Sequence, residues 1–114
     1  MSSLPLGYFQ FDNLIKGRVP FFLLRSAVEI EQAYGVMEKM HLRNFSMVLE
    51  KLDMTTAQAA LAERQARKED PVVVLDETGL EAKRLADELA REGYLNVYFV
   101  LGGWQEMLAE MKGS

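Results

Sequence analysis

Cysteine is absent from this 114-residue sequence. The absence excludes disulfide bonds, thiolate metal ligands and cysteine nucleophiles together. A chain without cysteine also fits the reducing cytoplasm, which is the location we expect for it. Any chemistry of this chain must therefore proceed without a sulfur nucleophile of its own.

Long apolar runs and concentrated positive charge are also missing. No segment approaches the roughly 20 consecutive apolar residues that a membrane span requires, and the first residues do not form a signal peptide. The net charge is −4, with 17 acidic and 13 basic residues, whereas nucleic-acid binding requires a concentrated basic surface. We therefore expect neither a membrane nor a nucleic acid as partner.

What the chain does contain is enough apolar material, 49% of its residues, for one hydrophobic core. We expect a single domain over residues 1–114, with residues 113–114 frayed or a cloning remnant. Continuous apolar segments at residues 19–24, 72–75 and 96–101 predict strands that are buried on both faces.

Helical patterns lie between these strands. Residues 82–92 form an amphipathic pattern that Gly93 ends in a left-handed conformation, and residues 104–111 form another. Strands that alternate with helices predict an α/β fold with a central, mostly parallel sheet and helices on both of its faces. Phe9-Gln10-Phe11 predicts a further edge strand, because its apolar residues alternate with a polar one.

Two further regions lie between the apolar segments at residues 19–24 and 72–75. A capping box that begins at Thr55 predicts an alanine-rich helix over residues 55–68. Residues 26–52 are undecided, and the segment 45–49 fits a strand or a helix equally well. This middle part contains Met37, Met40 and Met47, for which core filling is the preferred interpretation and an adaptable partner surface the alternative.

Acidic residues follow the apolar strand at residues 72–75. In open α/β sheets, ligands bind beyond the carboxyl ends of the strands, where the N–H groups of the next helix converge. The candidate loop consists of Asp76, Glu77, Thr78, Gly79, Leu80, Glu81 and Ala82. Three acids within one turn are typical of a solvated surface, so we predict no metal site and no cofactor.

Three motifs follow one another in a specific order and spacing. They are the candidate loop, the segment Gly93-Tyr94-Leu95-Asn96-Val97-Tyr98 and the motif Gly102-Gly103-Trp104. Together they resemble the rhodanese-like (sulfurtransferase) domain family over residues 71–107. The resemblance implies a rhodanese-like domain in which Asp76 takes the position of the catalytic cysteine. A carboxylate cannot form a persulfide. The implied protein is a catalytically inactive binding or regulatory module, and we expect a protein partner.

The first half of the chain is less similar to the family. Arg25 is identified as a remnant of the family's Asp-x-Arg strand end, with Leu23 in the place of the aspartate. His41 receives no role, because a lone histidine is most often an ordinary surface or core residue. For Asp76 we favour a structural interpretation, in which its carboxylate accepts the N–H groups at the start of the following helix.

Two alternatives remain to be weighed. The turn from Asp76 to Leu80 is also similar to that of anti-sigma-factor-antagonist (STAS) domains, where a hydroxyl is phosphorylated; Thr78 would then be the acceptor of a phospho-switch. An aspartyl-phosphate receiver is excluded, because the first strand, at residues 19–24, is not followed by the acids that hold its Mg²⁺.

Overall fold

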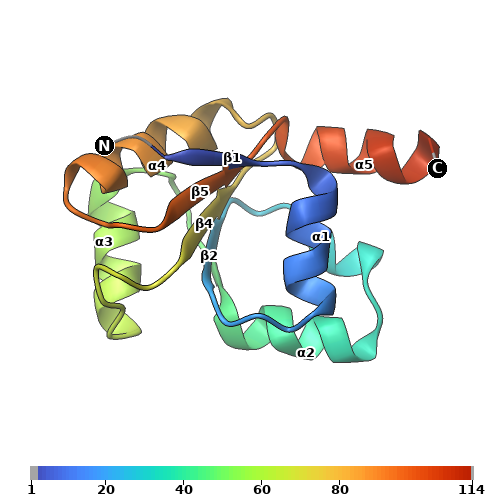
Figure 1. Ribbon diagram of the computed structural model, residues 1–114, viewed down its shortest axis with the longest axis horizontal. Helices are drawn as coiled ribbons and strands as arrows, with labels where there is room; N and C mark the ends of the chain where they lie inside the picture. The colour runs from blue at the N-terminus through green and yellow to red at the C-terminus, as the bar shows by residue number, and fades with distance from the viewer. Residues whose placement is uncertain (1–2, 114) are drawn as a thin grey trace.

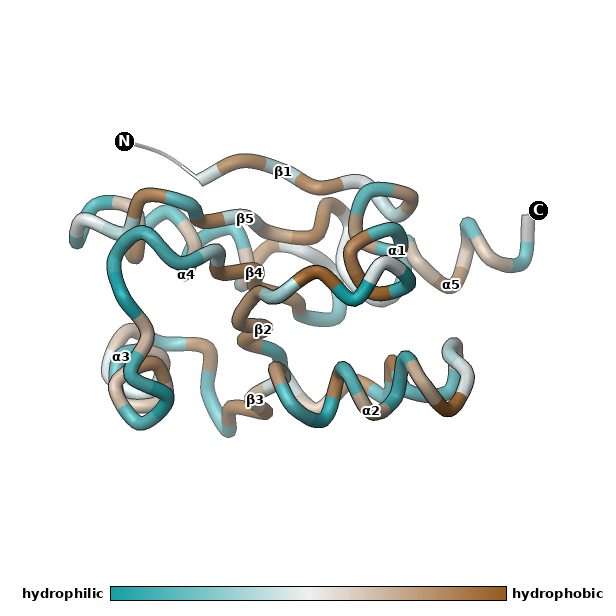
Figure 2. The backbone as a smooth tube through the Cα atoms, turned by 60° about the horizontal axis from the view of Figure 1, so that its bottom comes forward, coloured by the Kyte–Doolittle hydropathy of each residue, from teal (hydrophilic) through white to brown (hydrophobic). Residues whose placement is uncertain are grey.

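The computed structural model describes residues 3–113, which form five parallel strands and the helices around them. The strand order is β1-β5-β4-β2-β3; Figure 1 labels the first four of these strands, and Figure 2 labels all five. The strands are β1 (Leu4–Leu6), β2 (Phe22–Arg25), β3 (Ser46–Val48), β4 (Val72–Leu75) and β5 (Val97–Val100). The helices are α1 (Tyr8–Lys16), the 3-10 helix η1 (Ile30–Ala33), α2 (Val36–Phe45), α3 (Met54–Glu63), α4 (Leu80–Arg91) and α5 (Gly103–Gly113).

The central strand β4 shows why helices cover both faces of the sheet. Successive side chains of a strand point to opposite faces, and all four residues of β4 are buried. Val72 and Val74 pack in a core with α3 and α4, whereas Val73 and Leu75 pack in a second core with α1, η1, α2 and α5. Figure 2 shows β2 and β4 as hydrophobic segments at the centre. The predicted α/β single domain is confirmed.

The predicted edge strand at Phe9-Gln10-Phe11 is wrong, because these residues lie in α1. Phe11 and Ile15, four residues apart, are fully buried against the sheet, whereas Phe9 is 66% exposed. A helix that follows so few residues can imitate the alternation of a strand. The edge strand is β1, and Leu4 lies opposite Tyr98 of β5 in the parallel register.

The start and end of α3 also differ from the prediction. Asp53 is its N-cap, and the Asp53 carboxylate accepts the Thr56 N–H at 2.8 Å, so the capping box at Thr55 is wrong. The helix ends at Glu63 rather than at residue 68, because its buried stripe ends at Leu61. Gln65 then adopts a left-handed φ of 56°, and the chain turns away.

The undecided middle of the chain contains η1, α2 and β3. At residues 45–49 the helix α2 ends at Phe45 and the strand β3 begins at Ser46. Met47 faces the core and Val48 faces solvent, as the two-residue period of a strand requires. The methionines therefore divide, since Met47 is buried whereas Met37 and Met40 are half exposed.

The remaining elements agree with the sequence patterns. β4 has its predicted bounds, and α4 ends before Gly93, whose φ is 102°. β2 begins at Phe22, three residues later than predicted, and β5 occupies residues 97–100. α5 continues to Gly113, while Ser114 of the predicted frayed end lies outside the described residues. No helix in residues 3–113 combines the length and the apolarity needed to cross a membrane.

Asp87 of α4 fixes the beginning of the chain beside the sheet. Its Oδ1 accepts hydrogen bonds from the Ser3 N–H at 3.1 Å and the Ser3 hydroxyl at 2.5 Å, and its Oδ2 accepts one from Lys83 Nζ at 2.8 Å. The hydrogen bond from Lys83, followed by that from the Ser3 hydroxyl, lowers the pKa of Asp87 to about 2. At pH values above the pKa that Asp87 has in the unfolded chain, its ionised carboxylate therefore stabilises the folded state.

We expect Asp87→Asn to lower the free energy of unfolding at pH 7 by about 1 kcal/mol, because it removes a charge-assisted contact. The difference from wild type should shrink as pH falls from about 4 towards 2, because the carboxylate of the unfolded chain is protonated first and that of the folded chain only near pH 2. Urea unfolding at several pH values measures this. Glu88→Gln, which removes an acid paired with exposed Arg84, should have a smaller effect; equal effects would contradict the role of Asp87.

Candidate functional site

The carboxylate of Asp76 fills the loop between β4 and α4. The residue is only 4% exposed. Its Oδ1 accepts the Gly79 N–H at 2.6 Å, and its Oδ2 accepts the Glu81 N–H at 3.0 Å. The hydrogen bonds predicted between Asp76 and the start of the helix are therefore present. Backbone groups that would be available to an external anion at a helix N-terminus are bonded to this side chain instead.

A second turn presses against this loop from the end of β5. Trp104 donates its N–H to the Asp76 carbonyl at 2.8 Å, and Gln105 donates to the Glu77 carbonyl at 3.0 Å. Gly103 has a φ of 66°, and a Cβ atom there would lie 2.5 Å from the Asp76 carbonyl oxygen. Only glycine allows both this conformation and this approach. The motif Gly102-Gly103-Trp104 thus forms backbone contacts with the candidate loop and holds it in place.

The other side chains of the loop point outward. Glu77, Thr78 and Glu81 are exposed, and Leu80 is 77% exposed. The exception is Ala82, which is buried on the core side of α4. The Thr78 hydroxyl accepts a long hydrogen bond of 3.4 Å from the Leu80 N–H. Phosphorylation of the exposed Thr78 stays a prediction, and mass spectrometry of the native protein tests it.

The acids at the rim are only partly compensated. The Glu81 carboxylate pairs with Arg84 of α4 at 2.7 Å, and Arg84 also pairs with Glu88 at 2.7 Å. The hydrogen bond that Arg84 donates to Glu81 is the main cause that raises the pKa of Arg84. One guanidinium therefore serves two carboxylates, and no other cation of the described residues is paired with this loop. The rim keeps its acidic character.

Arg25 lies at the carboxyl end of β2, next to β4 in the sheet. It is buried, and its guanidinium donates hydrogen bonds to the Ser46 hydroxyl at 2.6 Å, to the Val28 carbonyl at 2.6 Å and to the Glu31 carboxylate. The residue identified as a family remnant is therefore bonded to its own chain. Sequence reasoning missed Glu31 and Ser46, because the fold and not a spacing motif brings them to Arg25.

His41 is a core residue of α2. Its Nε2 lies 3.0 Å from the Val19 carbonyl oxygen, and its ring is 4.8 Å from that of Phe45 between centroids. Val19 precedes β2, so this contact is at the amino end of the strand, opposite Arg25. Within residues 3–113, no group of three or more His, Asp or Glu side chains is arranged to hold a metal ion.

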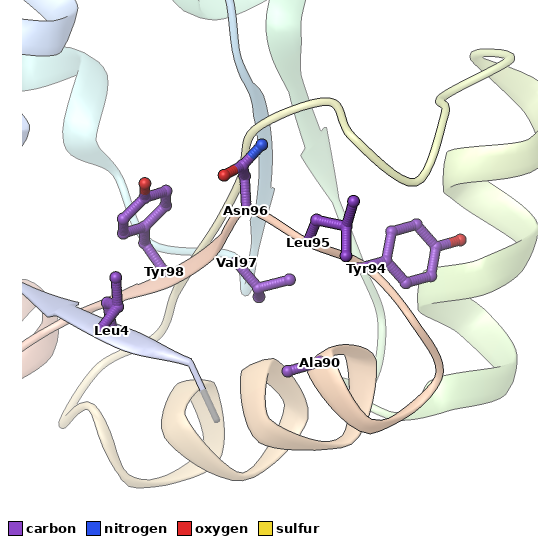
Figure 3. A pocket seen from close by; sticks show the side chains of 7 residues that line it. All are labelled: Leu4, Ala90, Tyr94, Leu95, Asn96, Val97 and Tyr98. Carbon is purple, nitrogen blue, oxygen red and sulfur yellow. The ribbon is translucent and has the colours of Figure 1, made fainter. Parts of the chain in front are cut away.

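Two surface hollows lie at the amino ends of the strands, away from the candidate loop. One of about 280 Å³ is lined by Leu4, Ala90, Tyr94, Leu95, Asn96, Val97 and Tyr98. Figure 3 shows Leu4 and Tyr98 on one side of it, Tyr94 on the other, and Ala90 of α4 below. Another of about 280 Å³ shares Tyr98 and is lined mainly by apolar residues such as Phe21 and Val73. Sequence reasoning missed both, because they combine residues from three or more separate segments.

Comparison with known proteins places these features in one family. The model of the rhodanese-like domain family matches residues 14–110. A rhodanese-related protein from Thermoplasma volcanium has a similar structure, with a TM-score of 0.56 and 15% identity, over 94% of this chain and 92% of that chain. The rhodanese-like domain of an Anabaena protein gives a TM-score of 0.63 and 12% identity, over 96% and 76%. No curated protein matches the chain.

The close approach of the two turns yields a test with a matched control. Gly103→Ala should lower the free energy of unfolding by more than about 2 kcal/mol, because it combines a left-handed φ with a clash against the Asp76 carbonyl. Gly93 also has a positive φ, of 102°, but a Cβ there meets nothing within 4 Å, so Gly93→Ala should cost only about 1 kcal/mol. If urea unfolding shows that both variants lose the same free energy of unfolding, the close approach at Gly103 adds nothing to the cost of its left-handed conformation.

Proposed function

The chain belongs to the rhodanese-like domain family, and from this premise we propose that it is a catalytically inactive member that acts as a binding or regulatory module for another protein. The observation that carries the proposal is the buried carboxylate of Asp76, which accepts the amide hydrogens of the loop. The chain lacks the cysteine nucleophile, and the carboxylate of Asp76 occupies the loop. Both features argue against sulfur transfer.

The first support is chemical. Sulfur transfer by this family depends on a thiolate that attacks a sulfur donor and carries a persulfide. The chain contains no cysteine, and the corresponding position holds Asp76. A carboxylate oxygen cannot carry the persulfide, so this route is closed for the chain.

The second support is electrostatic. An anionic sulfur donor would have to displace a carboxylate that is covalently attached and already bonded to Gly79 and Glu81. It would also meet the negative charges of Glu77 and Glu81 at the rim. Two like charges about 4 Å apart repel by about 1 kcal/mol in water and by several-fold more in a partly buried site. The loop therefore disfavours the substrates that the family uses.

The third support is what remains exposed. The loop keeps its fold and its contact with α5, while Leu80 at its rim is largely exposed and lies among acids. A stable scaffold with an internally satisfied loop can still recognise another protein through its outer side chains. Binding through the surface is the function that such an arrangement supports best.

A thiosulfate:cyanide assay tests the inactivity. Wild type should show no turnover above the uncatalysed rate. Asp76→Cys alone should remain far below an active family member, because Glu77 and Glu81 repel the anionic donor. A triple variant, Asp76→Cys with Glu77→Arg and Glu81→Arg, should exceed the single variant. Turnover by wild type would overturn the proposal, and efficient turnover by Asp76→Cys alone would overturn its electrostatic support.

An anion titration tests whether Asp76 occupies the loop as an internal anion. Sulfate added to wild type should leave the amide NMR signals of residues 79–82 unchanged. In Asp76→Ala the Gly79 and Glu81 N–H groups lose their acceptor, so sulfate should shift these signals. Asp87→Ala serves as control, because its carboxylate lies elsewhere on α4. Equal shifts in wild type and Asp76→Ala would show that Asp76 does not block the loop.

A further inference from the structure

We propose that the outer face of α2, together with the end of α1, is the docking site for an acidic amphipathic helix of a partner protein. The inference rests on the proposed binding function and names the surface that performs it. We call this surface the α2 face and define it by Lys16, Arg18, Val36, Met37, Lys39, Met40 and Arg43.

The apolar part of the α2 face is unusually open. Val36 is 75% exposed, Met37 55% and Met40 52%. These three apolar residues lie close together, within little more than one helical turn. The opposite side of the same helix contributes His41 and Leu42 to the core. Figure 2 shows α2 along the outside of the molecule, on the opposite side from β1. Exposed methionines form adaptable apolar surfaces, and their clustering here goes beyond scattered surface residues.

Positive charge surrounds this apolar part. The chain as a whole has a net charge of −4, yet residues 16–18 and 36–45 contain four cations and a single acid, Glu38. Lys39 and Arg43 stand four residues apart on α2 and hence on the same side of the helix. A hollow of about 160 Å³ joins the two helices, lined by Lys16, Arg18, Met37 and Glu38. Lys16 is paired with Asp12 at 3.1 Å, so Arg18, Lys39 and Arg43 are the cations that a partner would meet.

Arg18 occupies a backbone position that suits glycine better. Its φ is 52°, and the bonds from Arg18 N–H to the Ile15 carbonyl and from Val19 N–H to the Leu14 carbonyl close the end of α1. A non-glycine residue in this conformation costs about 1 kcal/mol. Among the described residues, no carboxylate pairs with the Arg18 side chain. The chain thus holds an unpaired cation at the hollow at some cost in stability.

These features select an acidic amphipathic helix as the occupant. Apolar residues one helical turn apart accept anchors spaced three or four residues apart on a partner helix. The flanking cations complement carboxylates on the edges of that helix, which favours association and orientation. A membrane-binding helix needs a broad apolar face that it can insert, whereas half of α2 is committed to the core.

The probe is a synthetic peptide of about 18 residues with Leu and Phe on one helical face and Glu on the other, long enough for helix formation. In an NMR titration of the full chain, amide signals of residues 16–18 and 36–44 should shift. A control peptide with Lys in place of Glu should bind at least about tenfold more weakly. Raising the salt concentration from about 50 to about 200 mM should also weaken binding by the Glu peptide.

Two glycine variants separate binding from stability. Arg18→Gly should raise the stability of the chain and yet weaken peptide binding by about threefold to tenfold, because it removes strain and a cation together. Gln65→Gly relieves the same left-handed strain at the end of α3, so it should raise stability and leave binding unchanged. Loss of binding by the more stable Arg18→Gly cannot arise from unfolding.

Several results would overturn the inference. These are shifts confined to another surface such as the Leu80 rim, equal binding of the Lys peptide, or an Arg18→Gly variant that binds as well as wild type. Binding of the α2 face to vesicles of phosphatidylcholine and phosphatidylserine in preference to the Glu peptide would assign it to membranes. Concentration-dependent shifts of residues 36–44 without peptide would assign it to a second copy. Thiosulfate turnover by wild type would instead overturn the proposed function itself.

Discussion

The contact between the turn after β4 and the turn after β5 is the constraint on which the rest of the site depends. The Trp104 and Gln105 N–H groups are bonded to the carbonyls of Asp76 and Glu77, and the glycine at position 103 makes room for them. This contact places α5 so that Trp104 and Met107 enter one of the two cores. It also holds the backbone of Asp76, so that its carboxylate faces the start of α4.

A single side chain then determines what this geometry can do. Amide hydrogens that converge at a helix N-terminus stabilise negative charge, whether the charge belongs to a thiolate, a bound anion or a carboxylate. With Asp76 the charge is part of the chain and 4% exposed. The same hydrogen bonds that could activate a nucleophile therefore stabilise the loop. The chain therefore keeps the fold of the family without the thiolate on which the family's sulfur transfer depends.

The sequence predicted the second half of the chain better than the first, for physical reasons. β4, α4 and α5 carry strong local signals, namely a continuous apolar run, a stripe at three and four residues, and a glycine pair. In α1, the aromatic residues alternate with a polar residue as they would in a strand. At α3, the N-cap is Asp53 and not the predicted Thr55. The loop bonds of Asp76 follow from helix-end chemistry, whereas the partners of Arg25 depend on tertiary contacts that no spacing encodes.

Arg25 connects the candidate loop with the α2 face. The Ser26 N–H that follows Arg25 donates to the carbonyl of Leu75, the last residue before Asp76, at 3.1 Å. The Arg25 guanidinium holds Glu31 in η1, which precedes α2, and Ser46 in β3, which follows it. Both ends of α2 are thus tied to one buried side chain. A docking helix that is held rigidly binds with little loss of entropy. The buried Arg25 therefore positions the proposed α2 face, which lies outside the candidate loop.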